Sequence, residues 1–176
     1  MCRPWKNYIN FQLRSECQLI SALNAYYYLT GNRITQDSQE YESLIDLSLA
    51  RKGTALNIEK VHDKLGIEPI GYSNHFHILI NKWYKFNTQE EIEFPKEEQE
   101  FKLPIEMNVF HKKTGFHSVL IVDTCIKTEC IRITNFSDAT SLNGWFFSED
   151  LYQYIHHCNQ GWVFRLFGIK KKGSPK

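Results

Sequence analysis

The sequence predicts an α+β protein, in which helices come first and a mostly antiparallel sheet follows. Three stretches with helical spacing of apolar residues precede residue 66, and patterns typical of strands begin at residue 67. With 176 residues, 42% of them hydrophobic and 23% charged, the chain is long enough for one domain with its own core. We expect this domain to span residues 1–169, followed by a disordered basic tail over residues 170–176.

The first helix is expected in the stretch SECQLISALNAYYYLTG. Ser15 is a good N-cap residue, and Gln18 stands three residues later, which is the spacing of a capping box. Apolar residues then recur with helical spacing, and Gly31 stands where a left-handed residue commonly ends a helix. The pattern therefore predicts an amphipathic helix that starts just before Cys17.

Two further helices and a first group of strands are expected in the middle of the chain. The second helix is predicted to begin at Asp37, and the third to run from Thr54 to Gly66. Residues 67–86 have the composition of one or two strands, broken near a glycine. Residues 87–102 are rich in charge, which is typical of a solvated loop; an acidic lid beside a cleft is the alternative.

The last third of the chain has the pattern of a meander. Strands are expected over residues 103–111, 117–125 and 130–134, and the second of these is apolar enough to be central in the sheet. A short helix is predicted over residues 145–157, and a final strand over residues 160–170.

Composition excludes several classes of function. The net charge of +1 carries no basic footprint for nucleic acid, and no apolar run is long enough to cross a membrane. The first residues, MCRPWKNYINF, lack the apolar region of a secretory signal, so we expect a cytoplasmic protein. Five cysteines without CxxC pairs argue against a disulfide framework and a zinc ribbon. We expect no metal and no cofactor.

Cys17 is the candidate nucleophile. It falls in the first turn of the predicted helix, where free N–H groups and the helix dipole favour a thiolate. A nucleophilic cysteine needs a base, and we expect one in the segment Phe116-His117-Ser118. Gln12, five residues before the cysteine, carries an amide donor that could face an oxyanion. The alternative is that Cys17 is a small buried side chain, the usual fate of a free cysteine.

The third member of the site is expected at the end of the next strand. His117 opens one strand of a predicted hairpin and Asn135 ends the other, so the two residues are expected to be neighbours. The amide oxygen of Asn135 would accept a hydrogen bond from the imidazole. An even-numbered turn that pairs Cys125 with Cys130 would instead place Asp138 opposite the histidine, and a bulge would be needed to favour Asn135.

Four motifs occur in order along most of residues 10–140: Gln12 upstream of SECQLISALNAYYYLTG; GTALNIEKVHDKLGIEP; LPIEMNVF followed by GFHSVLIVD; and IRITNFSD. In these motifs the chain resembles the papain-like cysteine peptidases, and among them the bacteriocin-processing (double-glycine leader) type. The resemblance implies a papain-like fold with Cys17 as nucleophile and His117 as base. It also implies Asn135 as the residue that orients the base, and Gln12 as the oxyanion donor.

The expected function is therefore that of a thiol-dependent peptidase. It would cleave a peptide or isopeptide bond of a peptide or protein substrate through an acyl-enzyme. Two alternatives remain: an acyltransferase or deconjugating enzyme on the same fold, and a catalytically silent binding or inhibitory module. Gln18, which stands where many relatives have glycine, and the short spacing from Gln12 to Cys17 favour the silent module.

Overall fold

The computed structural model describes residues 3–13, 15–48, 57–73, 75–76, 83–85, 91–92, 102–111, 115–136, 143–147, 150 and 165–174. Within these ranges the protein has the α+β layout that the sequence predicts. Its helical elements are η1 (Trp5–Asn7), α1 (Cys17–Thr30), α2 (Gln39–Ser48), α3 (Ile58–Leu65) and η3 (Ile126–Thr128). Its strands are β1 (Ile67–Ser73), β2 (His75–Phe76), β3 (Trp83–Lys85), β4 (Glu91–Ile92), β5 (Ile105–His111), β6 (Gly115–Cys125), β7 (Cys130–Thr134), β8 (Trp145–Phe147) and β9 (Arg165–Lys171).

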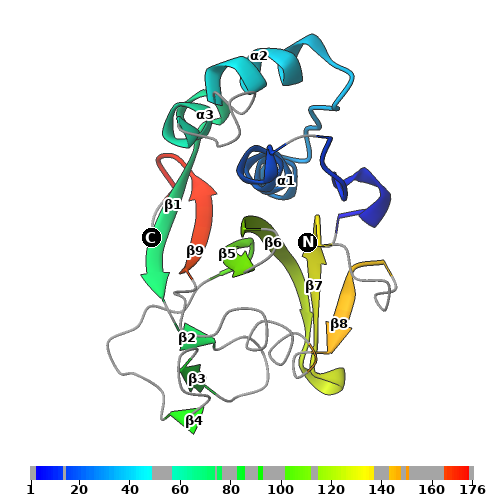
Figure 1. Ribbon diagram of the computed structural model, residues 1–176, viewed down its shortest axis with the longest axis vertical. Helices are drawn as coiled ribbons and strands as arrows, with labels where there is room; N and C mark the ends of the chain where they lie inside the picture. The colour runs from blue at the N-terminus through cyan, green and yellow to red at the C-terminus, as the bar shows by residue number, and fades with distance from the viewer. Residues whose placement is uncertain are drawn as a thin grey trace.

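An antiparallel sheet forms the centre of the described structure. Its six strands follow the order β1-β9-β5-β6-β7-β8, so β6 lies between β5 and β7, as its apolar run predicts. Helix α1 packs on β6, and α2 and α3 lie on the other side of α1 (Figure 1). The main core surrounds α1, from the sheet on one side to α2 and α3 on the other, and includes Leu19, Leu23, Ile45, Val61 and Leu120.

A second, smaller sheet is formed by β2, β3 and β4. Strand β4 falls in the charged stretch over residues 87–102. Most of that stretch lies outside the described residues, so the expected loop or lid stays a prediction.

Helix α1 begins at Cys17, but its start differs from the predicted capping box. The N-cap residue is Glu16, and its side chain makes no capping hydrogen bond. Its Oε1 atom instead accepts hydrogen bonds from the Leu13 N–H (2.9 Å) and the Tyr41 hydroxyl (3.2 Å). The Ser15–Gln18 capping box is therefore wrong, because the turn before α1 is held by a buried glutamate. The predicted end is confirmed at Gly31, which has a φ of 82°.

Helix α2 begins later than predicted, and the predicted end of the third helix is confirmed. Ser38, and not Asp37, caps α2, since its hydroxyl accepts a hydrogen bond from the Tyr41 N–H at 3.1 Å. Helix α3 begins at Ile58 and ends at the left-handed Gly66. The predicted start at Thr54 lies outside the described residues.

The helix predicted from residue 145 is wrong at its start, because Trp145–Phe147 form strand β8 and pair with β7. The Arg132 guanidinium lies 4.5 Å from the Trp5 ring centroid and 5.5 Å from that of Trp145. Strand pairing and this cation–π contact outweigh the local helical pattern. Most of the remainder of the predicted helix lies outside the described residues.

The predicted tail boundary at residue 170 is also corrected. Strand β9 continues to Lys171, which pairs with Ile67 on β1. Lys170 forms an ion pair with Glu68 at 3.3 Å, and the Lys172 N–H donates to the Gly66 carbonyl at 2.9 Å. Lys170 and Lys171 are therefore part of β9, which lies between β1 and β5 in the sheet, and not of a solvated tail.

Candidate functional site

Cys17 is buried at the start of α1, with its sulfur against strand β6. The backbone N–H groups of Ser118 and Gln18 bond to the sulfur, and both favour the thiolate. Burial has the largest effect and raises the pKa of the thiol, and the charge of Glu106 raises that pKa further. The thiolate expected from the helix N-terminus is therefore not the resting form, because burial outweighs the local N–H groups.

His117 is held by the end of strand β7. Its Nε2 atom lies 2.7 Å from the main-chain carbonyl oxygen of Asn135. Since a carbonyl oxygen only accepts hydrogen bonds, Nε2 carries the proton, and the lone pair of a neutral ring is on Nδ1. Burial lowers the pKa of His117, and the bond to Asn135 partly opposes this effect. The histidine therefore has the tautomer that a general base needs.

Asn135 meets His117 as predicted, but through a different atom. The main-chain carbonyl accepts the imidazole hydrogen bond, so the predicted role of the amide oxygen is wrong. The Asn135 side chain instead donates from Nδ2 to Gln12 Oε1 (3.3 Å), and its N–H donates to Asn10 Oδ1 (3.3 Å). A positive φ of 54° turns this residue away from strand geometry. Asp138, the alternative, lies outside the described residues.

The hairpin register explains how the histidine and the asparagine come together. Cys125 pairs with Cys130, as an even-numbered turn predicts. An extra residue on β6 near Val122 then shifts the register, so that Ile121 pairs with Ile133. The extra residue shifts the end of β7 toward His117, and this is the direction of shift that the predicted bulge requires.

Gln12 lies beside this pair, in an exposed turn before α1. Because its Oε1 accepts from Asn135, its amide N–H₂ group is left to donate elsewhere. The structure therefore joins Gln12, Asn135 and His117 in one chain of contacts. Among the described residues, no hydrogen bond joins the Cys17 sulfur to the imidazole; the sulfur meets the neighbouring residue, Ser118.

Glu106 is a buried carboxyl beside the cysteine that the sequence reasoning missed. Its Oε1 lies 2.8 Å from the Ser118 hydroxyl, which is 3.1 Å from the Ser21 hydroxyl on α1. Burial raises the pKa of Glu106 to about 7, although the bond to Ser118 opposes the shift. When protonated, Glu106 donates to Ser118, and Ser118 then donates to Ser21. One glutamate inside the apolar run PIEMNV was the signal available in the sequence.

Asn24 is a second polar residue that was not anticipated. Its side chain holds both main-chain groups of Ile9, accepting from the N–H (2.8 Å) and donating to the carbonyl (2.9 Å). It also donates to the Thr134 hydroxyl at 3.0 Å. Asn24 therefore fixes the segment that carries Gln12 against the end of β7.

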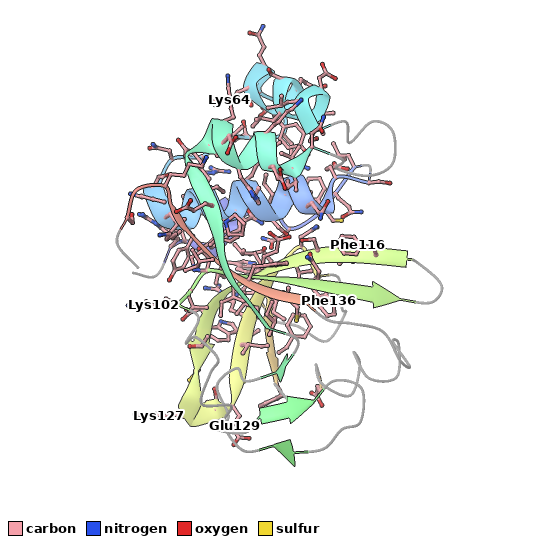
Figure 2. All side chains as sticks on the ribbon, turned by 90° about the vertical axis from the view of Figure 1, so that its left-hand side faces the viewer. Lys64, Lys102, Phe116, Lys127, Glu129 and Phe136 are labelled. Carbon is pink, nitrogen blue, oxygen red and sulfur yellow. The ribbon has the colours of Figure 1, made fainter. Side chains whose placement is uncertain are left out.

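Exposed apolar side chains flank the site. Phe11 and Leu13, on either side of Gln12, are 61% and 66% exposed. Phe116, which precedes His117, is 48% exposed and lies at the end of β6 nearest α1 (Figure 2). We call Phe11, Leu13 and Phe116 the apolar rim.

Comparison with known proteins adds no assignment: a scan against protein-family models finds no match, and a search of the curated proteins finds no similar sequence. In the ranges that the structure describes, no helix has the length and apolar character needed to cross a membrane. No group of three or more histidine, cysteine or acidic side chains in those ranges could hold a metal ion.

Proposed function

We propose that this protein is a thiol-dependent peptidase with a papain-like fold, similar to the bacteriocin-processing (double-glycine leader) peptidases. The observation that carries the proposal is that two consecutive residues of β6 provide the imidazole and the main-chain contact to the cysteine sulfur. The Ser118 N–H bonds to the Cys17 sulfur, and His117 has its Nε2 fixed by a carbonyl oxygen. A cysteine, an imidazole and a group that orients the imidazole are the parts that thiol acyl transfer requires.

The directions of the two pKa shifts favour a neutral resting pair. A raised pKa for Cys17 and a lowered pKa for His117 leave a neutral thiol and a neutral imidazole near pH 7. As the sulfur attacks the carbonyl carbon, Nδ1 of His117 takes the thiol proton, and it then returns that proton to the leaving amine. Water, activated by the same imidazole, hydrolyses the thioester and regenerates the thiol. The side chains must approach each other when substrate binds.

The oxyanion would be held by main-chain and amide donors. The N–H of Cys17, at the start of α1, is free of a helix partner, and Gln12 has an amide N–H₂ group to offer. The contact between Gln12 and Asn135 sets the amide beside the base. A cytoplasmic location fits this chemistry, since a reducing compartment keeps a nucleophilic cysteine free.

The substrate that suits this site is a peptide with large apolar side chains near the scissile bond. The residues of the apolar rim adjoin the base and the proposed oxyanion donor in the sequence, and burial of their exposed surface by substrate would be favourable. The acidic stretch over residues 90–100 would favour a basic peptide instead. These two preferences are separated by the choice of probe.

Peptidyl acyloxymethyl ketones test the proposal directly. Probes with leucine or phenylalanine at the position next to the ketone are compared with lysine and glutamate probes, using intact mass. We expect a covalent adduct at Cys17 that forms fastest with the apolar probes and is lost in Cys17→Ala and His117→Ala. Cys125→Ser is the matched control and should react like the natural chain. Equal labelling in His117→Ala would contradict the proposed base.

The same reaction separates the alternatives. If peptide products form, an added amine reports on acyl transfer, because water and amines compete for one acyl-enzyme. A catalytically silent binding module is favoured by the raised pKa of Cys17 and by the separate hydrogen bonds of the two reactive side chains. That alternative predicts no adduct with any of the four probes.

A further inference from the structure

Two cysteines face each other across the hairpin that β6 and β7 form. Cys125 is the last residue of β6 and Cys130 the first of β7, and they pair directly in the antiparallel register. Directly opposed residues in such a pair have Cα atoms about 4.5–5.5 Å apart. Disulfides span Cα separations of about 4.4–6.8 Å. The backbone therefore already has the spacing that a disulfide requires, and both thiols are free and partly exposed.

The loop between the two strands brings both sulfurs to Thr128. The Cys130 thiol donates to the Thr128 carbonyl oxygen at 3.2 Å. Cys125 is bonded by the Thr128 side chain and by the N–H groups of Thr128 and Lys127, and these contacts lower the pKa of its thiol. We therefore expect Cys125 to attack first, as the thiolate. Cys130, directly opposite on β7, is placed to attack the Cys125 sulfur in a second step.

This pair is separate from the Cys17 site. Lys127 and Glu129, in the loop, mark the end of the hairpin far from α1, whereas Phe116 lies at the end next to α1 (Figure 2). The hairpin thus carries the cysteine pair at one end and the histidine at the other. A reaction at the pair does not require that Cys17 be active.

We propose that Cys125 and Cys130 form a redox modification site, which closes to an intrachain disulfide with glutathione disulfide and reopens with excess glutathione. The Cys125 thiolate attacks one sulfur of glutathione disulfide, which breaks that S–S bond and releases one glutathione thiolate. Cys130, having lost its proton, then attacks the Cys125 sulfur of the mixed disulfide and releases the second. Two protein thiols are oxidised, and one glutathione disulfide is reduced to two thiols that take up the two protons.

Peptide mapping of the full chain tests the proposal. The natural chain, Cys125→Ser, Cys130→Ser and the control Cys17→Ser are incubated with glutathione disulfide without oxygen, then digested with trypsin. Trypsin cleaves after Lys127, between the two cysteines, so a disulfide appears as two linked peptides. We expect these linked peptides in the natural chain and in Cys17→Ser, and their loss after excess glutathione.

The single variants separate the two steps. Cys130→Ser should stop at a glutathione adduct on Cys125, because the second thiol is missing. Cys125→Ser should form an adduct on Cys130 at least about tenfold more slowly, since it removes the thiol that the Thr128 hydroxyl and the N–H groups of Thr128 and Lys127 contact, whereas the Cys130 thiol donates to a carbonyl oxygen. The proposal is overturned if the natural chain keeps two separate adducts without linked peptides, or if Cys130 pairs with a different cysteine. It stands or falls independently of the peptidase proposal.

Discussion

Replacing Glu106 by glutamine should stabilise the protein at alkaline pH and leave it almost unchanged at acid pH. The carboxyl is fully buried, and its pKa is raised from 4.5 to about 7. Glutamine keeps the shape and an oxygen that accepts from the Ser118 hydroxyl, so the substitution removes the charge with little loss of packing.

The size of this change in stability follows from the difference between the pKa of Glu106 in the folded chain and its pKa in the unfolded chain. Between pH 4.5 and about 7 the unfolded chain releases the Glu106 proton while the folded chain keeps it. The free energy of unfolding therefore falls as pH rises through this window, and above it the full cost remains. A shift of this size corresponds to about 3 kcal/mol, at about 1.4 kcal/mol per pKa unit. For a chain of this length, at about 2–4 °C per kcal/mol, that is a change of about 6–12 °C in Tm.

Thermal unfolding at a series of pH values measures this effect. The Tm of Glu106→Gln should exceed that of the natural chain at pH about 8, and the two should converge near pH 4.5. Glu59→Gln makes the same chemical change at an exposed residue of α3 and is the matched control. Alkylation of Cys17 should also become faster in Glu106→Gln at pH about 8, because the Glu106 charge raises the pKa of that thiol.

A different result would refute the reasoning. If Glu106→Gln is no more stable than the natural chain at pH about 8, or if the gap is constant from pH about 5 to 8, Glu106 is not a buried titrating carboxyl. If the gap appears but the alkylation rate of Cys17 is unchanged, the electrostatic link between the two residues is absent.

Three further predictions concern other parts of the molecule. Asn135→Gly should slow probe labelling less than His117→Ala does, because it loses the side-chain bond to Gln12 but keeps the carbonyl and the positive φ that hold the imidazole. Asn135→Ala should in addition cost about 1 kcal/mol in unfolding experiments. A labelling loss in the glycine variant as large as that in His117→Ala would contradict this. Gly144→Ala should lower Tm by about 5–10 °C, because Gly144 has a φ of 77° and an added Cβ would overlap the Trp5 ring. An unchanged Tm would contradict the packing of Trp5 against Gly144. Iodoacetamide at pH about 7.5 should label Cys125 before Cys17, because polar neighbours lower the pKa of the first thiol and burial raises that of the second; the reverse order by peptide mass would contradict it.

The sheet could be predicted largely from the sequence because its signals are local. The runs that became β5, β6 and β7 are apolar and bounded by turn residues, and these strands lie where they were expected. That pattern alone brought His117 near Asn135, since adjacent strands of a hairpin must have neighbouring ends. The pairing of Cys125 with Cys130 indicates that a bulge is needed to bring Asn135 toward His117. The position of that bulge, near Val122, depends on packing that the periodicity of the sequence does not encode.

The features that the sequence did not predict depend on contacts between distant segments. No local pattern marks Glu16 as a buried residue, yet it is buried and bonded to Tyr41, which lies on α2. Trp145–Phe147 has a local pattern compatible with a helix, and only pairing with β7 makes it a strand. Glu106 lies on a strand that was correctly placed, but its burial and pKa follow from the helix that covers it. Local propensity is a weak guide where such contacts decide the outcome.

The main-chain carbonyl of Asn135 changes what this position requires. A side-chain amide would demand asparagine for its oxygen, whereas a carbonyl oxygen demands only a backbone that turns with positive φ. Asparagine suits such a backbone, and its amide is then free to bind Gln12. The main-chain carbonyl of Asn135 therefore orients the proposed base, and its side-chain amide orients the proposed oxyanion donor. Because Asn24 holds the Gln12 segment and Thr134 together, a small shift of β7 against α1 would move both groups at once.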